Sequence, residues 1–427
     1  MDRITIDGGA PLRGEVQVGG SKNAALPIMT AALLADSPTT LSNVPGLRDT
    51  LTMADILRAL GARVDFADGV MRIDPAEFRI AEAPYDMVRK MRASIYVLAP
   101  MLMRLGRAKV SQPGGCAIGP RPIDLHVKGM KALSAEVSLD HGYIVAENRA
   151  MTGAEVSLAG PNGSSVGATA NTAMMAALTP GETIIRGAAH EPEIAELARF
   201  LRAMGADLEG EGTSTLRIRG VPALKGCAYS IIPDRIEAGT FFCAAAITEG
   251  DVVVRGVQVA HLEAVIEKLS EMGVYVAAED GAVRVACDGP PRPVSIRTLP
   301  FPGFPTDLQA QFMALLSLAD GCSTIIETIY QERFIHVPEL QRMGAQIRLT
   351  GGQAIIQGVK KLAGAPVMAS DLRASAALVV AGLAAEGLTD IHRVYHIDRG
   401  YESIERKLSG LGANIRRVAT TRKNGNN

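Results

Sequence analysis

The sequence predicts an α/β protein of two domains, each built from three copies of one unit, with apolar helices inside and sheets outside. Its 427 residues exceed the size at which a single hydrophobic core usually stops growing. An apolar residue followed by Gly or Ser and then by Ala or Val recurs six times, and the middle residues lie 68 to 73 positions apart. We infer six diverged copies of one structural unit. The tripeptides are Leu60-Gly61-Ala62, Leu133-Ser134-Ala135, Met204-Gly205-Ala206, Met272-Gly273-Val274, Met343-Gly344-Ala345 and Leu411-Gly412-Ala413.

The elements of each copy follow one order. A helix rich in Ala, Met and Leu comes first, as at 24–34, 94–103, 168–178 and 374–385. A β-rich run follows, as at 182–186 or 251–255, and then an amphipathic helix such as 193–204, which ends at a Gly. Two short strands come last, for instance 63–66 and 70–73, and the Asp68-Gly69 pair between them is typical of a hairpin.

The first helix of each unit is apolar on nearly every side. A helix without a polar face belongs inside a core rather than on its surface. We therefore expect three units in each half of the chain, with these helices buried and the sheets wrapped outside them. The break between the halves is expected near 229–233, between the third and fourth copies.

Composition and charge exclude several classes of function. A net charge of −1, an aromatic content of 4% and the lack of Trp give neither the cationic surface nor the stacking groups of a nucleic-acid-binding protein. Five scattered cysteines without C-x-x-C spacing argue against a disulfide framework or a zinc site, and we expect no cofactor or metal. The acidic N-terminus and the absence of a long apolar run predict neither secretion nor membrane insertion, so a cytoplasmic protein is expected.

The most distinctive stretch is the loop from Pro113 to His126. Paired glycines precede Cys116, and Arg121 follows it. Glycines let the backbone approach a ligand closely, and a neighbouring cation lowers the pKa of a thiol. The loop predicts a reactive cysteine, although taken alone it is also compatible with an ordinary turn.

Charged and polar residues gather where the apolar helices begin. Helix N-termini carry unpaired N–H groups and a partial positive charge, so a face on which they converge attracts phosphates and carboxylates. With the added cations, the sequence predicts a binding site for a small polyanion. The residues are Lys22, Asn23, Arg92, Ser165, Val166, Gly167, Arg235, Asp307 and Arg373, to which Arg121, Arg333 and Arg399 add charge.

Each of these residues also has an ordinary structural interpretation. A single Arg or Lys before a helix is most often a solvated surface charge. Asp307 is by default a helix cap or a first-turn acid, but it is also the only carboxylate among the cations at these positions, as a general base would be. We expect His126 and His336 to form structural hydrogen bonds.

Eight segments together resemble the UDP-N-acetylglucosamine 1-carboxyvinyltransferase family. The likeness covers essentially the whole chain up to about residue 417, and it is specific as a set, whereas Ser-Lys-Asn alone is a weak signal. The segments are 20–27, the Cys116 loop, 165–169, 233–237, 304–307, 332–334, 371–375 and 398–402.

The resemblance implies a fold of two inside-out α/β domains built from six βαβαββ units, with the N-terminal strand in the second domain. On this basis the first domain is 23–231, which carries the Cys116 loop, and the second domain is 1–22 with 232–420. Residues 421–427 form a polar tail that we expect to be disordered.

The resemblance also implies a reaction, the first committed step of bacterial peptidoglycan synthesis. The enolpyruvyl group of phosphoenolpyruvate moves to the 3′-hydroxyl of UDP-N-acetylglucosamine through a tetrahedral intermediate, with loss of phosphate. Lys22, Arg121 and Arg399 then bind phosphoenolpyruvate by charge-assisted hydrogen bonds. By family analogy Cys116 supplies the acid or helps to release product and is alkylated by fosfomycin, and Asp307 is the base.

The family's remaining substrate contacts carry over to this chain residue by residue. Closure of the two domains would exclude water from the bound substrates. Contacts to the diphosphate around 162–164 are not assigned, because the family varies there. The implied substrate-binding residues are Lys22, Asn23, Arg92, Arg121, Pro122, Ile123, Asp124, Leu125, Ser165, Val166, Gly167, Asp307, Ile329, Arg333, Arg373 and Arg399.

Three alternatives stay open. A transferase acting on shikimate 3-phosphate shares the repeat architecture, but the 23–27 continuation and the Cys116 loop argue against it. A specialised homologue could modify another nucleotide. A non-catalytic nucleotide-sugar-binding protein is the third, and the presence of both Cys116 and Asp307 argues against it. The sequence predicts neither the oligomeric state nor any feedback ligand.

Overall fold

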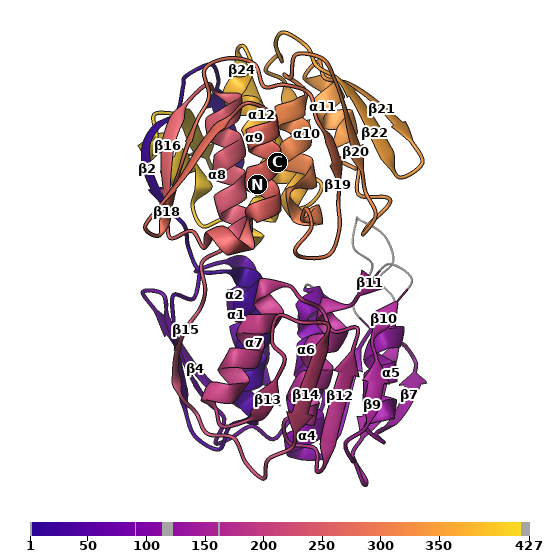
Figure 1. Ribbon diagram of the computed structural model, residues 1–427. Helices are drawn as coiled ribbons and strands as arrows, with labels where there is room; N and C mark the ends of the chain where they lie inside the picture. Colours follow the sequence, from indigo (N-terminus) through magenta and orange to yellow (C-terminus); the bar gives the residue numbers. More distant parts are fainter. Residues whose placement is uncertain (1, 90, 113–122, 161–162, 420–427) are drawn as a thin grey trace. The chain divides into compact units, whose positions relative to one another are not determined.

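The protein consists of two compact α/β domains, as the computed structural model shows for residues 2–89, 91–112, 123–160 and 163–419 (Figure 1). The first domain holds the described residues from Gly20 to Ile232, and the second holds those up to Gly19 and from Pro233 onward. Each domain has its own continuous hydrophobic core. The predicted fold class is confirmed. The predicted tail, 421–427, lies outside the described residues.

The first domain contains three units of the predicted kind, each with a helix, a strand, a second helix and a hairpin. The first unit is α1 (Lys22–Ala31, continued by η1, Ala32–Leu34), β3 (Thr39–Ser42), α2 (Arg48–Ala59), β4 (Arg63–Ala67) and β5 (Val70–Asp74). The second is α3 (Tyr85–Val88), η2 (Arg92–Val97), α4 (Leu98–Leu105), β6 (Arg107–Ser111), α5 (Asp124–Ala132), β7 (Glu136–Asp140) and β8 (Tyr143–Glu147). The third is β9 (Glu155–Ser157), β10 (Ala159–Gly160), β11 (Gly163–Ser164), α6 (Val166–Ala176), β12 (Glu182–Arg186), α7 (Pro192–Ala203), β13 (Asp207–Glu209) and β14 (Thr215–Arg219), followed by β15 (Ala228–Ser230).

The second domain repeats this plan and begins with two strands from the N-terminus, β1 (Arg3–Asp7) and β2 (Arg13–Gln17). The fourth unit is α8 (Arg235–Ile247), β16 (Asp251–Arg255), η3 (Val259–His261), α9 (Glu263–Glu271), β17 (Tyr275–Glu279) and β18 (Ala282–Ala286). The fifth is β19 (Ser295–Arg297), η4 (Thr306–Leu308), α10 (Gln309–Leu316), β20 (Cys322–Ile326), α11 (Val337–Arg342), β21 (Gln346–Thr350) and β22 (Gln353–Gln357). The sixth is β23 (Pro366–Met368), α12 (Leu372–Ala384), β24 (Leu388–His392), η5 (Val394–Arg399), α13 (Ile404–Gly410) and β25 (Asn414–Val418).

Five of the six unit sheets share one strand order. In these five, the strand after the buried helix pairs in parallel with a short edge strand, as β16 does with β2, and antiparallel with a hairpin strand. The sheet of the second unit, β6-β8-β7, has no such edge strand among the described residues. In the sixth sheet only β25 follows the second helix, and β1 occupies the place of the missing hairpin strand, antiparallel to both β24 and β25. The N-terminal strand therefore completes the last unit of the chain, a contribution that the repeat pattern alone did not predict.

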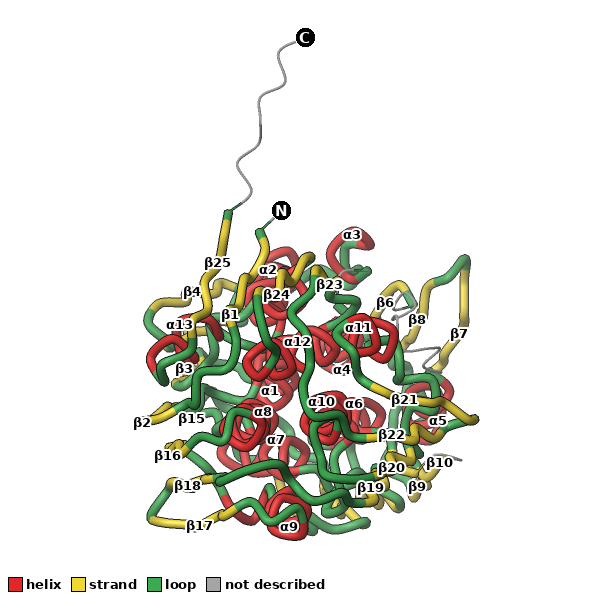
Figure 2. The backbone as a smooth tube through the Cα atoms, turned by 90° about the horizontal axis from the view of Figure 1, so that it is seen from above, coloured by secondary structure: helices red, strands yellow, loops and turns green. Residues whose placement is uncertain are grey.

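The first helix of each unit is buried because it has no polar face to expose. Every residue of α8 after Arg235 is buried, and so is every residue of α12 before Ala384. In the second domain α8, α10 and α12 pack against one another, and the strands lie outside them (Figure 2). Along a buried helix of this kind, the backbone N–H and C=O groups bond to one another. Only at the two ends of the helix do unpaired backbone groups remain, and these can bind other polar groups.

The middle residue of each repeated tripeptide has a left-handed backbone just after the second helix of its unit. The φ angles at Gly61, Gly205, Gly273, Gly344 and Gly412 lie between 83° and 105°, and Ser134 has φ 65°. A left-handed residue at this point ends the helix and turns the chain into the hairpin strand. The spacing of the six tripeptides therefore reports one backbone turn repeated six times.

No helix among the described residues is both long enough and apolar enough to cross a membrane.

Two glycines at the end of α13 give a matched test of this turn. Added Cβ atoms at Gly410 and Gly412 would meet no atom within 4 Å, but Gly412 has φ 97° whereas Gly410 is the last residue of the helix. We expect Gly412→Ala to lower the free energy of unfolding by about 1 kcal/mol through backbone strain. Gly410→Ala should raise it by about 0.5 kcal/mol. Urea unfolding of both variants measures the two changes, and a loss of stability at both positions would contradict the assignment.

Candidate active site

Three predicted site residues of the second domain form one ionic cluster, in which two arginines contact the Asp307 carboxylate. Arg373 Nη2 lies 2.7 Å from Asp307 Oδ2, and Arg333 Nη1 lies 2.8 Å from Asp307 Oδ1. The side chains of both arginines are at most 6% exposed, whereas 27% of the Asp307 side chain remains accessible. The carboxylate therefore keeps an open edge while the two guanidinium groups are fixed behind it.

Helix starts and one loop position these three side chains. Asp307 lies in η4, directly before the buried helix α10, and Arg333 comes from the segment between β20 and α11. Arg373 is the second residue of α12, whose cap Asp371 accepts the Arg373 N–H at 2.7 Å. Asp307 was a candidate for a helix cap, but its carboxylate bonds to the two guanidinium groups.

The environment of Asp307 keeps it ionised. Burial by itself would raise its pKa, but the charges of Arg373 and Arg333 and their hydrogen bonds outweigh that effect and hold the pKa well below its ordinary value. Two cations against one carboxylate also leave one formal positive charge in the cluster. Such a cluster is suited to an anionic ligand group.

A polar contact inside the core ties Arg373 to the neighbouring helices. Tyr401 Oη lies 2.8 Å from Thr240 Oγ1 on α8, accepts from Gln311 Nε2 on α10 at 3.2 Å, and accepts from Arg373 Nη1 on α12 at 3.4 Å. Tyr401 is fully buried, and it follows the predicted site residue Arg399 by two positions. One hydroxyl thus links all three buried helices of the second domain and the segment that carries Arg399.

The predicted site residues of the first domain begin with Lys22. Its Nζ lies 3.1 Å from Asp49 Oδ2, and both side chains are at most 10% exposed. Ser21 caps α1 by accepting the Ala24 N–H at 3.4 Å, and Asn23 is the next residue of the helix and is half-buried. The ion pair with Asp49 fixes the ammonium group at the start of a buried helix.

A second group in the first domain surrounds His126 on α5. Its Nδ1 lies 3.0 Å from Asn171 Nδ2, which also donates to the Ile95 carbonyl at 3.1 Å. A Cβ added at Gly167 would lie 2.9 Å from His126 Nε2, so a glycine is required there for the ring to pack against the start of α6. Burial lowers the pKa of His126 to about 4, and the charge of Arg92 acts in the same direction. The expected structural role of His126 is thus confirmed, since the neutral ring bonds to Asn171 of α6, which in turn bonds to Ile95 of η2.

The remaining predicted residues have varied positions. Ile329 is half-buried after β20, Ile123 precedes α5, Asp124 is exposed in its first turn, and Leu125 is half-buried. Ser165 caps α6 by accepting the Ala168 N–H at 3.3 Å, and Val166 follows it. Cys116, Arg121 and Pro122 lie outside the described residues, so their predicted roles depend on the sequence alone.

The helix caps differ between the two domains. Neutral serines cap α1 and α6, whereas the aspartates Asp234 and Asp371 cap α8 and α12, each accepting two backbone N–H groups. An acidic cap offsets the partial positive charge of a helix N-terminus, and a serine does not. We infer that the helix starts of the first domain retain the greater attraction for anions, while arginines supply it in the second.

Several residues that hold the site residues in position were not predicted from the sequence. Asp49 resembled an ordinary first-turn acid, and Tyr401 was one residue of a quoted segment without an assigned role. Glu327 and Thr306, which contact the Arg333 segment, were not singled out. The available signal for Glu327 was an acidic residue directly after a β-rich run and six positions before Arg333.

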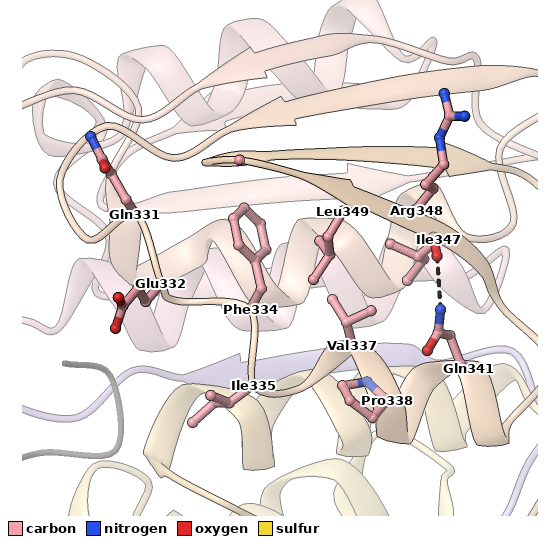
Figure 3. A pocket seen from close by; sticks show the side chains of 11 residues that line it. Gln331, Glu332, Phe334, Ile335, Val337, Pro338, Gln341, Ile347, Arg348 and Leu349 are labelled. Carbon is pink, nitrogen blue, oxygen red and sulfur yellow. Dashed lines mark hydrogen bonds between the residues drawn. The ribbon is translucent and has the colours of Figure 1, made fainter.

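A pocket of about 640 Å³ lies in the second domain beside the β21–β22 hairpin (Figure 3). Phe334, Val337 and Leu349 turn toward one another across it, and the Arg348 guanidinium points away from them (Figure 3). Asp307 is not among its lining residues. The charged residues that line the pocket, Glu332 and Arg348, have opposite charges and give no excess of positive charge for a polyanion, so we assign the candidate site to the ionic clusters. No group of three or more His, Cys, Asp or Glu side chains in the described ranges is arranged to hold a metal ion.

Comparisons with known proteins agree on one group of enzymes. Residues 6–408 match the family described as EPSP synthase (3-phosphoshikimate 1-carboxyvinyltransferase). The UDP-N-acetylglucosamine 1-carboxyvinyltransferase of Trichlorobacter lovleyi is 54% identical over 420 residues, which covers 98% of this chain and 100% of the relative. The protein of the same name from Geobacter metallireducens is 52% identical over 418 residues, again 98% of this chain and 100% of the relative.

Solved structures show the same likeness. The enolpyruvyl transferase NikO from Streptomyces tendae has a TM-score of 0.89 at 27% identity, covering 97% of this chain and 98% of that chain. An EPSP synthase from Acinetobacter baumannii shares the fold with a TM-score of 0.74 at 19% identity, covering 98% of this chain and 100% of that chain.

The buried histidines predict how stability depends on pH. Burial lowers the pKa of both His126 and His336 to about 4 from an ordinary value of 6.5, with charges of Asp371 and Arg333 acting in opposite directions on His336. Between these values the unfolded chain binds protons that the folded protein does not. The free energy of unfolding should therefore fall as pH drops from 6.5 toward 4, by up to roughly 3 kcal/mol for each ring.

Urea unfolding of His126→Gln and His336→Gln between about pH 7 and about pH 5 tests this prediction. Each replacement should flatten the dependence on pH, and the exposed His141→Gln is the matched control. If both variants keep the original slope, the two rings do not cause it.

Proposed function

Because this chain belongs to the UDP-N-acetylglucosamine 1-carboxyvinyltransferase family of enolpyruvyl transferases, we propose that it transfers the enolpyruvyl group of phosphoenolpyruvate to the 3′-hydroxyl of UDP-N-acetylglucosamine. Phosphate is the second product. The reaction is proposed as the first committed step of peptidoglycan synthesis, as the family resemblance implies. Relatives of this name in several bacteria, with 50% to 54% identity over nearly the whole chain, support the proposal.

The structural observation that carries the proposal is the accessible Asp307 carboxylate between two buried guanidinium groups. Transfer to a hydroxyl requires a group that accepts its proton, and a carboxylate that remains ionised can do so. The low pKa of Asp307 makes it a weak base toward a free alcohol. We propose that it takes the proton late, when the attacking oxygen has begun to bond to carbon and has become strongly acidic.

The proposed chemistry is an addition followed by an elimination. A proton is added to the methylene carbon of phosphoenolpyruvate, the sugar oxygen bonds to the adjacent carbon, and the hydroxyl proton passes to Asp307. The resulting tetrahedral intermediate then loses a methyl proton and expels phosphate, which restores the carbon–carbon double bond. Cys116 is proposed to supply the first proton or to assist product release, on the basis of the resemblance.

The cationic residues are proposed to bind the charged groups of the substrates. Lys22, Arg121 and Arg399 bind the phosphate and carboxylate of phosphoenolpyruvate, since arginine can bind either group through two parallel hydrogen bonds. Arg333 and Arg373 contribute positive charge beside Asp307. Residues assigned to the UDP-sugar are Asn23, Arg92, Arg121 to Leu125, Ser165 to Gly167, Asp307 and Ile329.

Phosphate release by the purified protein tests the proposed function. We expect release when phosphoenolpyruvate is supplied with UDP-N-acetylglucosamine, together with a product whose mass shows an added enolpyruvyl group. Release should be at background level with shikimate 3-phosphate or with other UDP-sugars as the acceptor. Release with another acceptor alone would favour one of the alternative transferases, and release with none would favour a binding protein.

Fosfomycin provides a control for the proposed thiol. We expect it to abolish phosphate release and to add its mass to the peptide that contains Cys116. A Cys116→Ser variant should resist alkylation. Full activity after treatment, with Cys116 unmodified by mass spectrometry, would remove the thiol from the proposed mechanism.

A further inference from the structure

Glu327 lies directly after β20 and accepts hydrogen bonds on both carboxylate oxygens. It is only 2% exposed. Oε1 accepts from Thr298 Oγ1 at 2.7 Å, and Oε2 accepts from Thr306 Oγ1 at 2.9 Å. Oε1 also accepts the backbone N–H groups of Ile329 at 2.8 Å and Tyr330 at 3.0 Å. Four donors therefore meet this one carboxylate, three of them on Oε1 and one on Oε2.

These bonds lead in two directions toward residues already assigned to the site. In the first, Arg333 Nη1 donates to Thr306 Oγ1 at 2.9 Å and also contacts Asp307 Oδ1 at 2.8 Å. Because the single Thr306 proton goes to Glu327, the hydroxyl oxygen presents a lone pair to Arg333. Glu327 therefore fixes the rotation of the Thr306 hydroxyl, whose oxygen accepts the hydrogen bond that orients the Arg333 guanidinium against Asp307.

The second direction is the backbone of the turn after β20. Glu327 holds the N–H groups of Ile329 and Tyr330, and the Tyr330 carbonyl accepts the Arg333 N–H at 2.8 Å. The Arg333 guanidinium also lies over the Tyr330 ring, 5.7 Å from its centroid. One buried carboxylate thus determines the path of the chain that carries both Ile329 and Arg333.

The corresponding turns of four other units are built differently. Four units turn the chain after the corresponding strand with a residue of positive φ, between 54° and 76°. The fifth unit uses the Glu327 carboxylate instead, which binds the next N–H groups directly. The four residues are Asn43 after β3, Gly187 after β12, Gly256 after β16 and Arg393 after β24.

We propose that Glu327 is a positioning residue for the transfer reaction, acting through Thr306 on the Arg333–Asp307 pair and through the Ile329–Tyr330 turn on the acceptor substrate. The expected changes in kcat and KM rest on the proposed function. The hydrogen bonds of Glu327 do not, and all of them join described residues of the second domain. A shift of reacting groups by about 1 Å can cost roughly 100-fold in rate, so a small change in this network has a measurable effect.

Glu327→Gln tests the proposal, since the amide has the same shape but only one acceptor oxygen. We expect kcat to fall roughly tenfold or more and KM for UDP-N-acetylglucosamine to rise. Thr306→Val, which interrupts only the first direction, should lower kcat by a similar factor and leave that KM nearly unchanged. Because Thr306→Val interrupts a direction that Glu327→Gln already disturbs, the double variant should have a kcat no lower than that of Glu327→Gln alone. Independent, multiplicative losses of kcat would overturn the proposal.

Glu339→Gln is the matched control. Glu339 also accepts a backbone N–H, that of Met368 at 3.0 Å, but it bonds to none of the site residues that the structure describes. We expect this variant to keep the original kcat and KM even if it loses stability. An equal loss of kcat in Glu339→Gln would show that Glu327→Gln acts through general destabilisation.

Urea unfolding of Glu327→Gln, Arg333→Met and the double variant forms a thermodynamic cycle that does not depend on turnover. If the unmodified protein shows no turnover, that result contradicts the proposed function, and this cycle still tests the positioning role. The two replacements should be non-additive, because each removes a member of the same hydrogen-bonded chain. Additive effects on stability would overturn the positioning role itself.

Discussion

One interaction, the pairing of Asp307 with Arg333 and Arg373, fixes the charged groups of the candidate site in the second domain. Removing one partner of a buried ion pair typically costs about 3–5 kcal/mol, so the three side chains hold one another in place. Two residues to which no ligand contact is assigned hold the arginines in position. Tyr401 connects Arg373 to the helix core, and Glu327 acts on Arg333 through Thr306. The carboxylate is kept ionised and accessible at the edge of an apolar core.

The repeated fold explains why such residues occur at helix starts. Helices that are buried on every side offer polar groups only at their ends, and the repeat presents one such end in each unit. The two domains use these ends differently. Serine caps leave the starts of α1 and α6 positive, whereas aspartate caps offset the starts of α8 and α12, where arginines supply the charge. The two domains therefore carry positive charge at their helix starts in two different ways.

Much of the fold was predictable from the sequence because the pattern is local. The tripeptides marked a left-handed turn in each unit, and the apolar helices had no surface to expose. The place of β1 beside β24 was not predictable from periodicity, because that pairing joins the two ends of the chain.

At the candidate site, charge identified Asp307 and Arg373, but only the structure could show the ion pair between them. Glu327 and Tyr401 act through hydrogen bonds across long separations in sequence, which spacing does not reveal.

Whether Asp307 reacts, or only neutralises two arginines, is best decided with Asp307→Asn, which keeps the shape of the side chain and removes its charge. The measurement is the rate of phosphate release at saturating substrates, with UDP-N-acetylglucosamine affinity determined by calorimetry and folding checked by urea unfolding. We expect a cooperatively folded variant that still binds the sugar nucleotide but turns over at least about 100-fold more slowly. A folded variant with a rate within a few-fold of the original would mean that the carboxylate only balances charge.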